Sequence, residues 1–250
     1  FERMFLLHGE SKYIDCMERT LYNGVISGMS MDGGRFFYPN PLSSDGKYKF
    51  NADGNTTRQP WFGCACCPSN LCRFIPSVPG YLYGVKDNNI YVNLFAGNTS
   101  TIKVNGKDVV LEETTEYPWN GDIKIAVKKS GVKNANLLVR IPGWVRNQVV
   151  PSDLYKYSDA EKPAYTVTVN GKAVEADLDA NKGYLPVKNI KKGDVIRIHF
   201  DMPVRTVVAN GKVADDNGKV AVERGPLVYC AEAVDNSNEP VLHAVMPEKP

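Results

Sequence analysis

The chain has 250 residues, of which 43% are hydrophobic and 23% are charged, so it is long enough to bury a core and is not a disordered chain. Its 30 basic and 28 acidic residues leave a formal charge of +2 without a basic stripe, which argues against a nucleic-acid partner. No apolar run reaches the roughly 18 residues that span a bilayer, and no signal-peptide pattern opens the chain, so we expect no membrane segment and leave the compartment open.

The first 28 residues predict helix. Apolar residues recur there at three- and four-residue steps, with a possible turn at His8 and Gly9, so the pattern predicts one helix or two short ones. Because the chain opens inside this pattern without an initiator Met, we expect it to have been cut from something longer. Downstream, RFFYPN predicts a short strand that stops at Pro39, and residues 39 to 60 predict a long polar loop, a feature that tends to be functional.

The remainder of the chain predicts a short helix and then many strands. Pro68 is suited to the first turn of a helix, and from Tyr81 onward segments such as NIYVNLF and DIKIAVKK have the period-two pattern of strands. Asn-Gly-Lys begins at positions 105, 170 and 210, and Asn-Gly suits a two-residue hairpin turn with positive φ at both positions. We therefore expect a mainly β fold, with an antiparallel β-sandwich over residues 85–250 preceded by a helical piece over residues 1–84.

The stretch WFGCACCPSN, residues 61 to 70, is the strongest chemical signal. Six cysteines in the whole chain are too few and too clustered for a disulfide framework. A thiolate is a nucleophile and a soft metal ligand, and Cys66 and Cys67 could form one edge of a tetrahedral zinc site. Their adjacent spacing argues against a structural zinc module, which spaces its cysteines as Cys-x-x-Cys. The alternative is that these cysteines are small buried residues that pack a loop.

WFGCACCPSN, together with RFFYPNPL and LYNGVISGMSMDG upstream, resembles the glycoside hydrolase family that contains the β-L-arabinofuranosidases, family 127 and its relatives. RIPGW at position 140 and the later strands resemble the β-sandwich of the same family, so nearly the whole chain is covered. The resemblance implies a zinc-dependent retaining glycoside hydrolase that acts on β-L-arabinofuranosides or related plant-derived sugars. It also implies that residues 1–84 resemble the end of an α/α-barrel catalytic domain.

The resemblance implies particular roles for the cysteine loop. Cys66 would be the catalytic nucleophile and a zinc ligand, Cys67 would be a second zinc ligand, and Tyr38 would belong to the substrate pocket. Trp61 could line a sugar pocket, with an equal case for packing the loop. The family's other two zinc ligands and its acid/base glutamate precede the start of this chain, and no Glu-x-Cys occurs here. We therefore expect the chain alone to be inactive and to bind zinc weakly or not at all, unless another cysteine completes a site.

Other residues are expected to have structural roles. Small, buried positions are expected for Cys64 and for Cys230, the latter as packing in a strand. Glu112, Glu113 and Glu116 are expected on a solvated strand face.

Two further expectations concern partners. The alternative function is a non-catalytic carbohydrate-binding or domain-packing β-sandwich, in which the cysteine loop is only a remnant. Because a helical remnant exposes apolar surface, we expect either a homodimer through that surface or a rearranged N-terminus.

Overall fold

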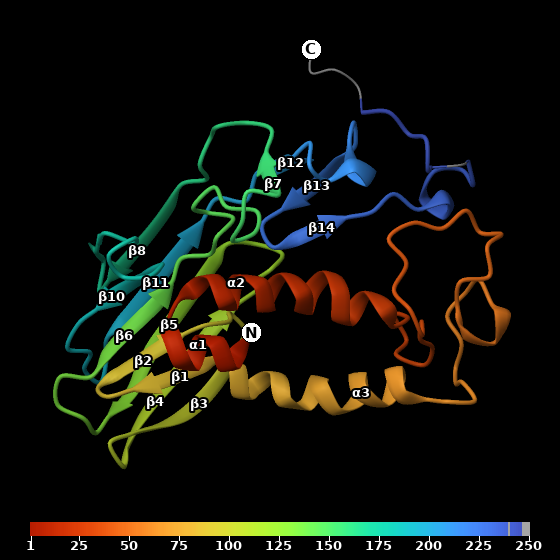
Figure 1. Cartoon of the computed structure of the whole chain (residues 1–250). Coiled ribbons are helices and arrows are strands. Elements are labelled where there is room, and N and C mark those ends of the chain that lie inside the picture. Colours follow the sequence, from red (N-terminus) through yellow and green to blue (C-terminus); the bar gives the residue numbers. More distant parts are fainter. Residues whose placement is uncertain (240, 247–250) are drawn as a thin grey trace. The chain divides into compact units, whose positions relative to one another are not determined.

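The computed structural model describes residues 1–239 and 241–246 of the chain (Figure 1). Contacts divide the chain into two compact units, each made of two segments. The first unit comprises Phe1–Arg19 and Val78–Leu227, and the second comprises Thr20–Ser77 and Val228–Pro250. No helix in the described part of the chain is long and apolar enough to cross a membrane, as the sequence predicts.

Two helices open the first unit, which confirms the second of the two helix alternatives. Helix α1 spans Glu2–His8 and helix α2 spans Ser11–Thr20. Gly9 ends α1 with a φ of 64°, a left-handed conformation that glycine adopts without steric cost. Helix α1 buries Phe5, whose ring meets that of Tyr91 edge-on at 5.4 Å, so α1 packs on strand β2 (Asn89–Val92).

The described chain contains three sheets, so the prediction of a mainly β fold is confirmed (Figure 1). Their strand orders are β1-β2-β6-β10, β3-β4-β5-β11-β8-β9 and β14-β13-β12-β7. Neighbouring strands are antiparallel in the pairings described, except that β2 and β6 run parallel. Besides β2, the strands are β1 (Tyr83–Lys86), β3 (Asn98–Val104), β4 (Lys107–Thr115), β5 (Asp122–Ser130), β6 (Asn136–Arg140), β7 (Tyr155–Tyr157), β8 (Tyr165–Val169), β9 (Lys172–Ala173), β10 (Tyr184–Val187), β11 (Val195–Phe200), β12 (Val204–Ala209), β13 (Val220–Arg224) and β14 (Leu227–Tyr229).

Two of the three Asn-Gly-Lys segments form the predicted hairpin turns. Asn105 and Gly106 join β3 to β4 with φ values of 48° and 76°, and the segment at 170 joins β8 to β9 in the same way. The third prediction is wrong in its detail. Residues 210 to 219 connect β12 to β13 as a longer loop with a short 3₁₀ turn, Ala214–Asp216, and the side chain of Asn210 accepts a hydrogen bond from the amide of Lys212.

Strand β4 corrects one expectation about surface charge. Glu113 was expected on a solvated face, but its side chain is 3% exposed. It follows Val109 and Leu111 on the buried face of the strand, because side chains two residues apart point to the same side. The period-two pattern therefore indicated that Glu113 is buried, but its charge favoured the opposite prediction.

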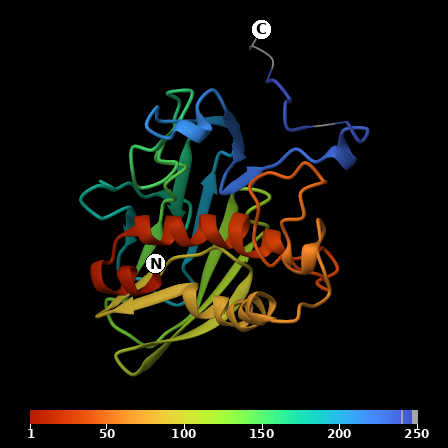
Figure 2. The same cartoon turned by 45° about the vertical axis from the view of Figure 1, so that its right-hand side comes forward.

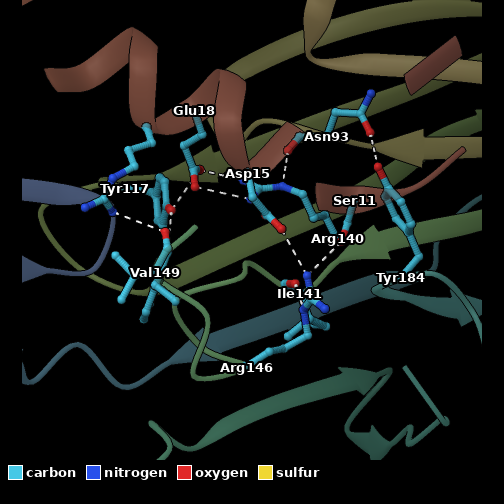
Figure 3. A network of polar contacts seen from close by, with 12 residues as sticks. Ser11, Asp15, Glu18, Asn93, Tyr117, Arg140, Ile141, Arg146, Val149 and Tyr184 are labelled. Carbon is cyan, nitrogen blue, oxygen red and sulfur yellow. Dashed lines mark hydrogen bonds and ion pairs between the residues drawn. The ribbon is translucent and has the colours of Figure 1, made fainter. Parts of the chain in front are cut away.

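A buried network of charged side chains connects α2 to β6 within the first unit (Figure 3). The guanidinium of Arg140, which is 0% exposed, donates to Glu18 at 2.5 Å, to Asp15 at 2.7 Å and to the carbonyl of Asn93 at 2.5 Å. Tyr117 donates a further hydrogen bond to Glu18 at 2.9 Å. Burial alone would lower the pKa of Arg140, but the negative charges of Glu18 and Asp15 raise it, so the guanidinium stays charged.

The second unit contains the long polar loop and helix α3, which spans Cys66–Phe74 (Figure 2). After α2 the chain forms a π turn, Leu21–Val25, and a 3₁₀ turn, Ile26–Gly28. The loop contains a 3₁₀ turn, Ala52–Gly54, while the turns Ile75–Tyr81 and Ala233–Asp235 lie outside it. The strand predicted for RFFYPN is reduced to isolated bridges from Phe36 to Met29 and to Gln59, so that prediction is wrong in extent.

Candidate active site

Helix α3 fixes the two adjacent cysteines at its first turn. Cys66 is the first residue of the helix, after Ala65 at the N-cap, and Pro68 occupies the third position, where a missing N–H costs no hydrogen bond. The prediction that Pro68 lies in the first turn of a short helix is therefore confirmed. Because the amide dipoles of a helix place partial positive charge at its N-terminus, this position favours a thiolate over a thiol.

Three of the four predicted site residues lie together at this helix end. The hydroxyl of Tyr38 is 2.9 Å from the sulfur of Cys66, and that sulfur is 3.7 Å from the sulfur of Cys67. The aromatic ring of Tyr38 meets Phe62 edge-on at 5.5 Å. Phe62 is 2% exposed, so it packs the loop, whereas Trp61 is 63% exposed and leaves its ring open to solvent.

The contacts around Cys66 lower its own pKa and raise the pKa values of its two neighbours. Hydrogen bonds from Tyr38 and then from Cys67 lower the pKa of Cys66. Burial and then the hydrogen bond to Cys66 raise the pKa of Cys67, and the contact with Cys66 also raises the pKa of Tyr38. As the pH rises, Cys66 is thus the first of these three groups to ionise, and the protonated hydroxyl of Tyr38 can donate a hydrogen bond to the thiolate.

The separation of the two sulfurs fits one edge of a zinc site. A tetrahedral zinc ion with Zn–S bonds of about 2.3 Å places two sulfur ligands about 3.8 Å apart. The observed 3.7 Å between Cys66 and Cys67 matches this value. Among residues 1–239 and 241–246, however, no group of three or more His, Cys, Asp or Glu side chains is arranged to hold a metal ion. The described residues therefore fit two of four ligand positions.

The other cysteines differ from expectation in their exposure. Cys64 and Cys230 are exposed, so the predictions that they are buried are wrong; Cys230 follows strand β14 instead of lying within it. Cys64 lies on the loop before α3. Cys72 is exposed and Cys16 is partly buried. The prediction followed from the usual burial of cysteine. The exposure of Cys64 depends on the conformation of an irregular loop, which has no periodic pattern in the sequence.

A cavity of 320 Å³ adjoins the cysteine pair within the second unit. Tyr38 and Cys67 contribute to its wall, together with apolar side chains such as Phe37 and Leu71 and the amides of Asn40 and Asn70. A mixed wall of aromatic and amide groups is suited to an organic molecule that has both apolar faces and hydroxyl groups.

Sequence analysis missed Asn51, which lies in the long loop. Its side chain is 3% exposed although most of its loop is exposed, and it accepts a hydrogen bond from the amide of Tyr38 at 2.8 Å. The available signal was the turn sequence NADGN, in which asparagine commonly bonds to the backbone that follows it.

Sequence comparison identifies three consecutive domain families along the chain. Residues 1–80 match the β-L-arabinofuranosidase catalytic domain of glycoside hydrolase family 127, residues 89–202 match its middle domain, and residues 204–249 match its C-terminal domain. A non-reducing end β-L-arabinofuranosidase of Bifidobacterium longum subsp. longum is 35% identical over 95% of this chain.

Solved structures give the same relationship. A family 127 β-arabinofuranosidase is similar with a TM-score of 0.86 and 58% identity over 93% of this chain. A family 127 β-L-arabinofuranosidase from Geobacillus stearothermophilus T6 is similar with a TM-score of 0.79 and 38% identity over 94% of this chain. The chain covers 34% of the Bifidobacterium protein and 35% of each of the two solved chains, so it spans about a third of the length of these relatives.

Proposed function

The chain belongs to glycoside hydrolase family 127, and from this premise we propose that it carries the nucleophile of a zinc-dependent retaining glycosidase. The proposed substrates are β-L-arabinofuranosides or related plant-derived sugars, as the names of the relatives suggest. One observation carries the proposal. The sulfur of Cys66 lies at the N-terminus of α3, 2.9 Å from the hydroxyl of Tyr38 and 3.7 Å from the sulfur of Cys67.

In the first step, the thiolate of Cys66 attacks the anomeric carbon of the sugar. A carbon–sulfur bond forms while the bond to the leaving-group oxygen breaks, and that oxygen takes a proton from a general acid. We assign the acid to a glutamate outside residues 1–250, as the family resemblance implies.

In the second step, water attacks the same carbon and gives a proton to the conjugate base of that acid. The electron pair of the carbon–sulfur bond returns to Cys66 as thiolate. Two inversions restore the configuration of the sugar, which makes the enzyme a retaining one.

The residues around Cys66 prepare its sulfur for this role. The hydroxyl of Tyr38 donates a hydrogen bond to the thiolate, and the N-terminus of α3 adds partial positive charge. Cys66 and Cys67 would hold zinc, which when bound would supply the positive charge that keeps a sulfur ligand deprotonated. The exposed ring of Trp61 offers an apolar face on which a sugar ring can stack.

We propose the finer architecture on the same grounds. Residues 85–250 would form the β-sandwich, and residues 1–84 would be the end of an α/α-barrel catalytic domain. Helix α1 leaves Leu6 61% and Leu7 71% exposed, and a second copy of the chain could cover them in a homodimer. The molar mass of the chain in solution, measured by light scattering, tests this association: the monomer mass alone would contradict it.

An activated substrate tests the nucleophile in this chain alone. A nitrophenyl β-L-arabinofuranoside has a weakly basic leaving group that departs without a general acid, so the first step can proceed when that acid is missing. Because the second step needs the base outside residues 1–250, the chain alone should not turn the substrate over, but it should complete the first step. After acid quenching, mass spectrometry should find one pentosyl group on Cys66, and none in Cys66→Ser.

The matched control is Cys72→Ser, which should keep the adduct because it removes another exposed thiol of the same helix. No adduct, or equal labelling of Cys64 and Cys72, would contradict the proposal. Saturable sugar binding without an adduct would support the non-catalytic carbohydrate-binding module instead.

A further inference from the structure

The segment that carries Tyr38 is held by three different parts of the second unit. The backbone N–H of Phe36 donates to the carbonyl of Gln59 at 2.8 Å, and that of Phe37 donates to the carbonyl of Gly28 at 2.9 Å. The N–H of Tyr38 donates to the side-chain oxygen of Asn51 at 2.8 Å. Of three consecutive amides, only that of Tyr38 is therefore held by a side chain, which a substitution can remove.

The side-chain amide of Asn51 makes three hydrogen bonds, one of them to the amide of Tyr38. Its side-chain oxygen accepts a second hydrogen bond from the N–H of Ala52 at 3.0 Å, and its side-chain nitrogen donates to the carbonyl of Thr57 at 2.8 Å. Its own backbone N–H donates to the carbonyl of Asn55 at 2.9 Å. With a side chain 3% exposed, Asn51 cannot exchange these partners for water without cost.

Ring contacts of Tyr38 and of its neighbour Phe37 restrict the segment once its backbone is fixed. The ring of Phe37 contacts the guanidinium of Arg58 at 4.3 Å and the ring of Phe50 at 5.3 Å. Tyr38 itself packs on Phe62. The position of the Tyr38 hydroxyl therefore depends on the position of the Tyr38 backbone, which the hydrogen bond to Asn51 holds.

We infer that Asn51 is a positioning residue, whose side-chain oxygen holds the Tyr38 backbone so that the Tyr38 hydroxyl meets the sulfur of Cys66. The inference rests on the proposed function, in which that hydroxyl donates to the nucleophile. Asn51 itself touches neither the sulfur nor the sugar, and it acts through Tyr38.

The experiment uses the chain with ¹³C at the hydroxyl-bearing ring carbon of tyrosine, whose chemical shift reports the hydrogen bond of the hydroxyl. Tyr38→Phe identifies the Tyr38 resonance, and Cys66→Ala gives its position without the sulfur partner. In Asn51→Ala we expect the resonance to move at least halfway from the wild-type position to the Cys66→Ala position.

Two more variants separate positioning from general damage to the loop. Asn51→Asp keeps both accepted hydrogen bonds and loses only the one donated to Thr57, so its resonance should stay near the wild-type position. Asn55→Ala is the matched control, because the Asn55 side chain donates only long bonds of 3.4 and 3.5 Å within the turn. It should leave the resonance unmoved.

The outcomes distinguish the inference from the function beneath it. If Cys66→Ala moves the resonance and Asn51→Ala does not, Asn51 has no positioning role while the proposed function stands. If Cys66→Ala leaves the resonance in place, the contact between Tyr38 and Cys66 is absent, and both are overturned. If Asn51→Asp moves it as far as Cys66→Ala does, the accepted hydrogen bonds do not position Tyr38, whatever the stability of Asn51→Ala.

Discussion

Arg140 in the first unit and Cys66 in the second are each at the centre of a cluster of ionisable groups, and the two clusters differ in completeness. Arg140 is fully buried, and its guanidinium is matched by Asp15, Glu18 and a backbone carbonyl. Cys66 is exposed, and its partners are the hydroxyl of Tyr38 and the thiols of Cys67 and Cys64. A cluster that is satisfied internally holds elements together, whereas one that is exposed and incomplete can take up a ligand or a substrate.

Removing Arg140 should give the largest effect, because it would leave Glu18 buried without its cation. We expect Arg140→Met to lower the free energy of unfolding by about 3–5 kcal/mol in urea titration. Adding Glu18→Gln should recover part of the loss, since it removes the stranded charge. Lys103→Ala, which breaks an exposed ion pair with Asp108, is the control and should change little. An equal loss in that control would show that burial is not the cause.

Glu113 is a buried carboxyl like Glu18, but its described partners are neutral hydrogen-bond donors and not a cation. It accepts hydrogen bonds from Tyr83 at 3.1 Å and from the amide of Ala96 at 3.1 Å, and burial raises its pKa from 4.5 to about 8. The unfolded chain loses this proton near pH 4.5 and the folded chain keeps it until about pH 8. The stabilising contribution is therefore complete below pH 4.5 and falls as the pH rises to 8.

Glu113→Gln should remove that pH dependence, since an amide resembles the protonated acid and cannot ionise. At pH 7 we expect the variant to be more stable than wild type by about 3 kcal/mol, and near pH 4 the two should be equal. Thermal unfolding at several pH values measures the difference. A constant difference across this range would mean that Glu113 is already ionised in the folded protein.

In the cysteine cluster we expect an effect on the pH dependence of thiol reactivity and not on the free energy of unfolding. In zinc-free protein, mass-resolved alkylation should show Cys66 reacting at lower pH than Cys67, because the pKa of Cys66 is lowered and that of Cys67 is raised. Tyr38→Phe removes the largest cause of the lowered pKa and should move the Cys66 profile to higher pH. Identical profiles for both cysteines would contradict the geometry.

Zinc binding should produce the smallest change in stability. Two thiols make a weak site, and zinc at about ten times its Kd would add about 1.4 kcal/mol to the free energy of unfolding. This increment should vanish in Cys66→Ser and in Cys67→Ser, and it should remain in Cys72→Ser. Elemental analysis of the same samples gives the zinc content. An increment that survives in Cys66→Ser would place the metal elsewhere.

Local patterns in the sequence were enough to predict most of the elements. Alternation identified strands such as β5 and β11, and Asn105-Gly106 identified a hairpin, because both signals depend on residues that are close in the chain. The same patterns could not show that α2 belongs with the strands, since the contact between Glu18 and Arg140 joins residues 122 positions apart.

The residues of the candidate site come from the sequence, whereas the contacts that support them do not. The Cys-Ala-Cys-Cys-Pro element identified Cys66 and Cys67, and the structure places Tyr38 beside them. The sequence did not predict which side chains of the irregular loop before α3 are buried. Its exposure of Cys64 and its burial of Asn51 depend on turns and side-chain hydrogen bonds, which have no period.

The distance along the chain between α2 and Arg140 also has a consequence during translation. At roughly 5–20 residues per second, a ribosome needs about 6–24 s to proceed from Glu18 to Arg140, which lie 122 positions apart. Throughout that interval Glu18 lacks its partner Arg140, and Ile14 and Met17, which are buried in the folded unit, belong to a unit that is not yet complete. The nascent helix is therefore a candidate for chaperone binding until β6 has emerged.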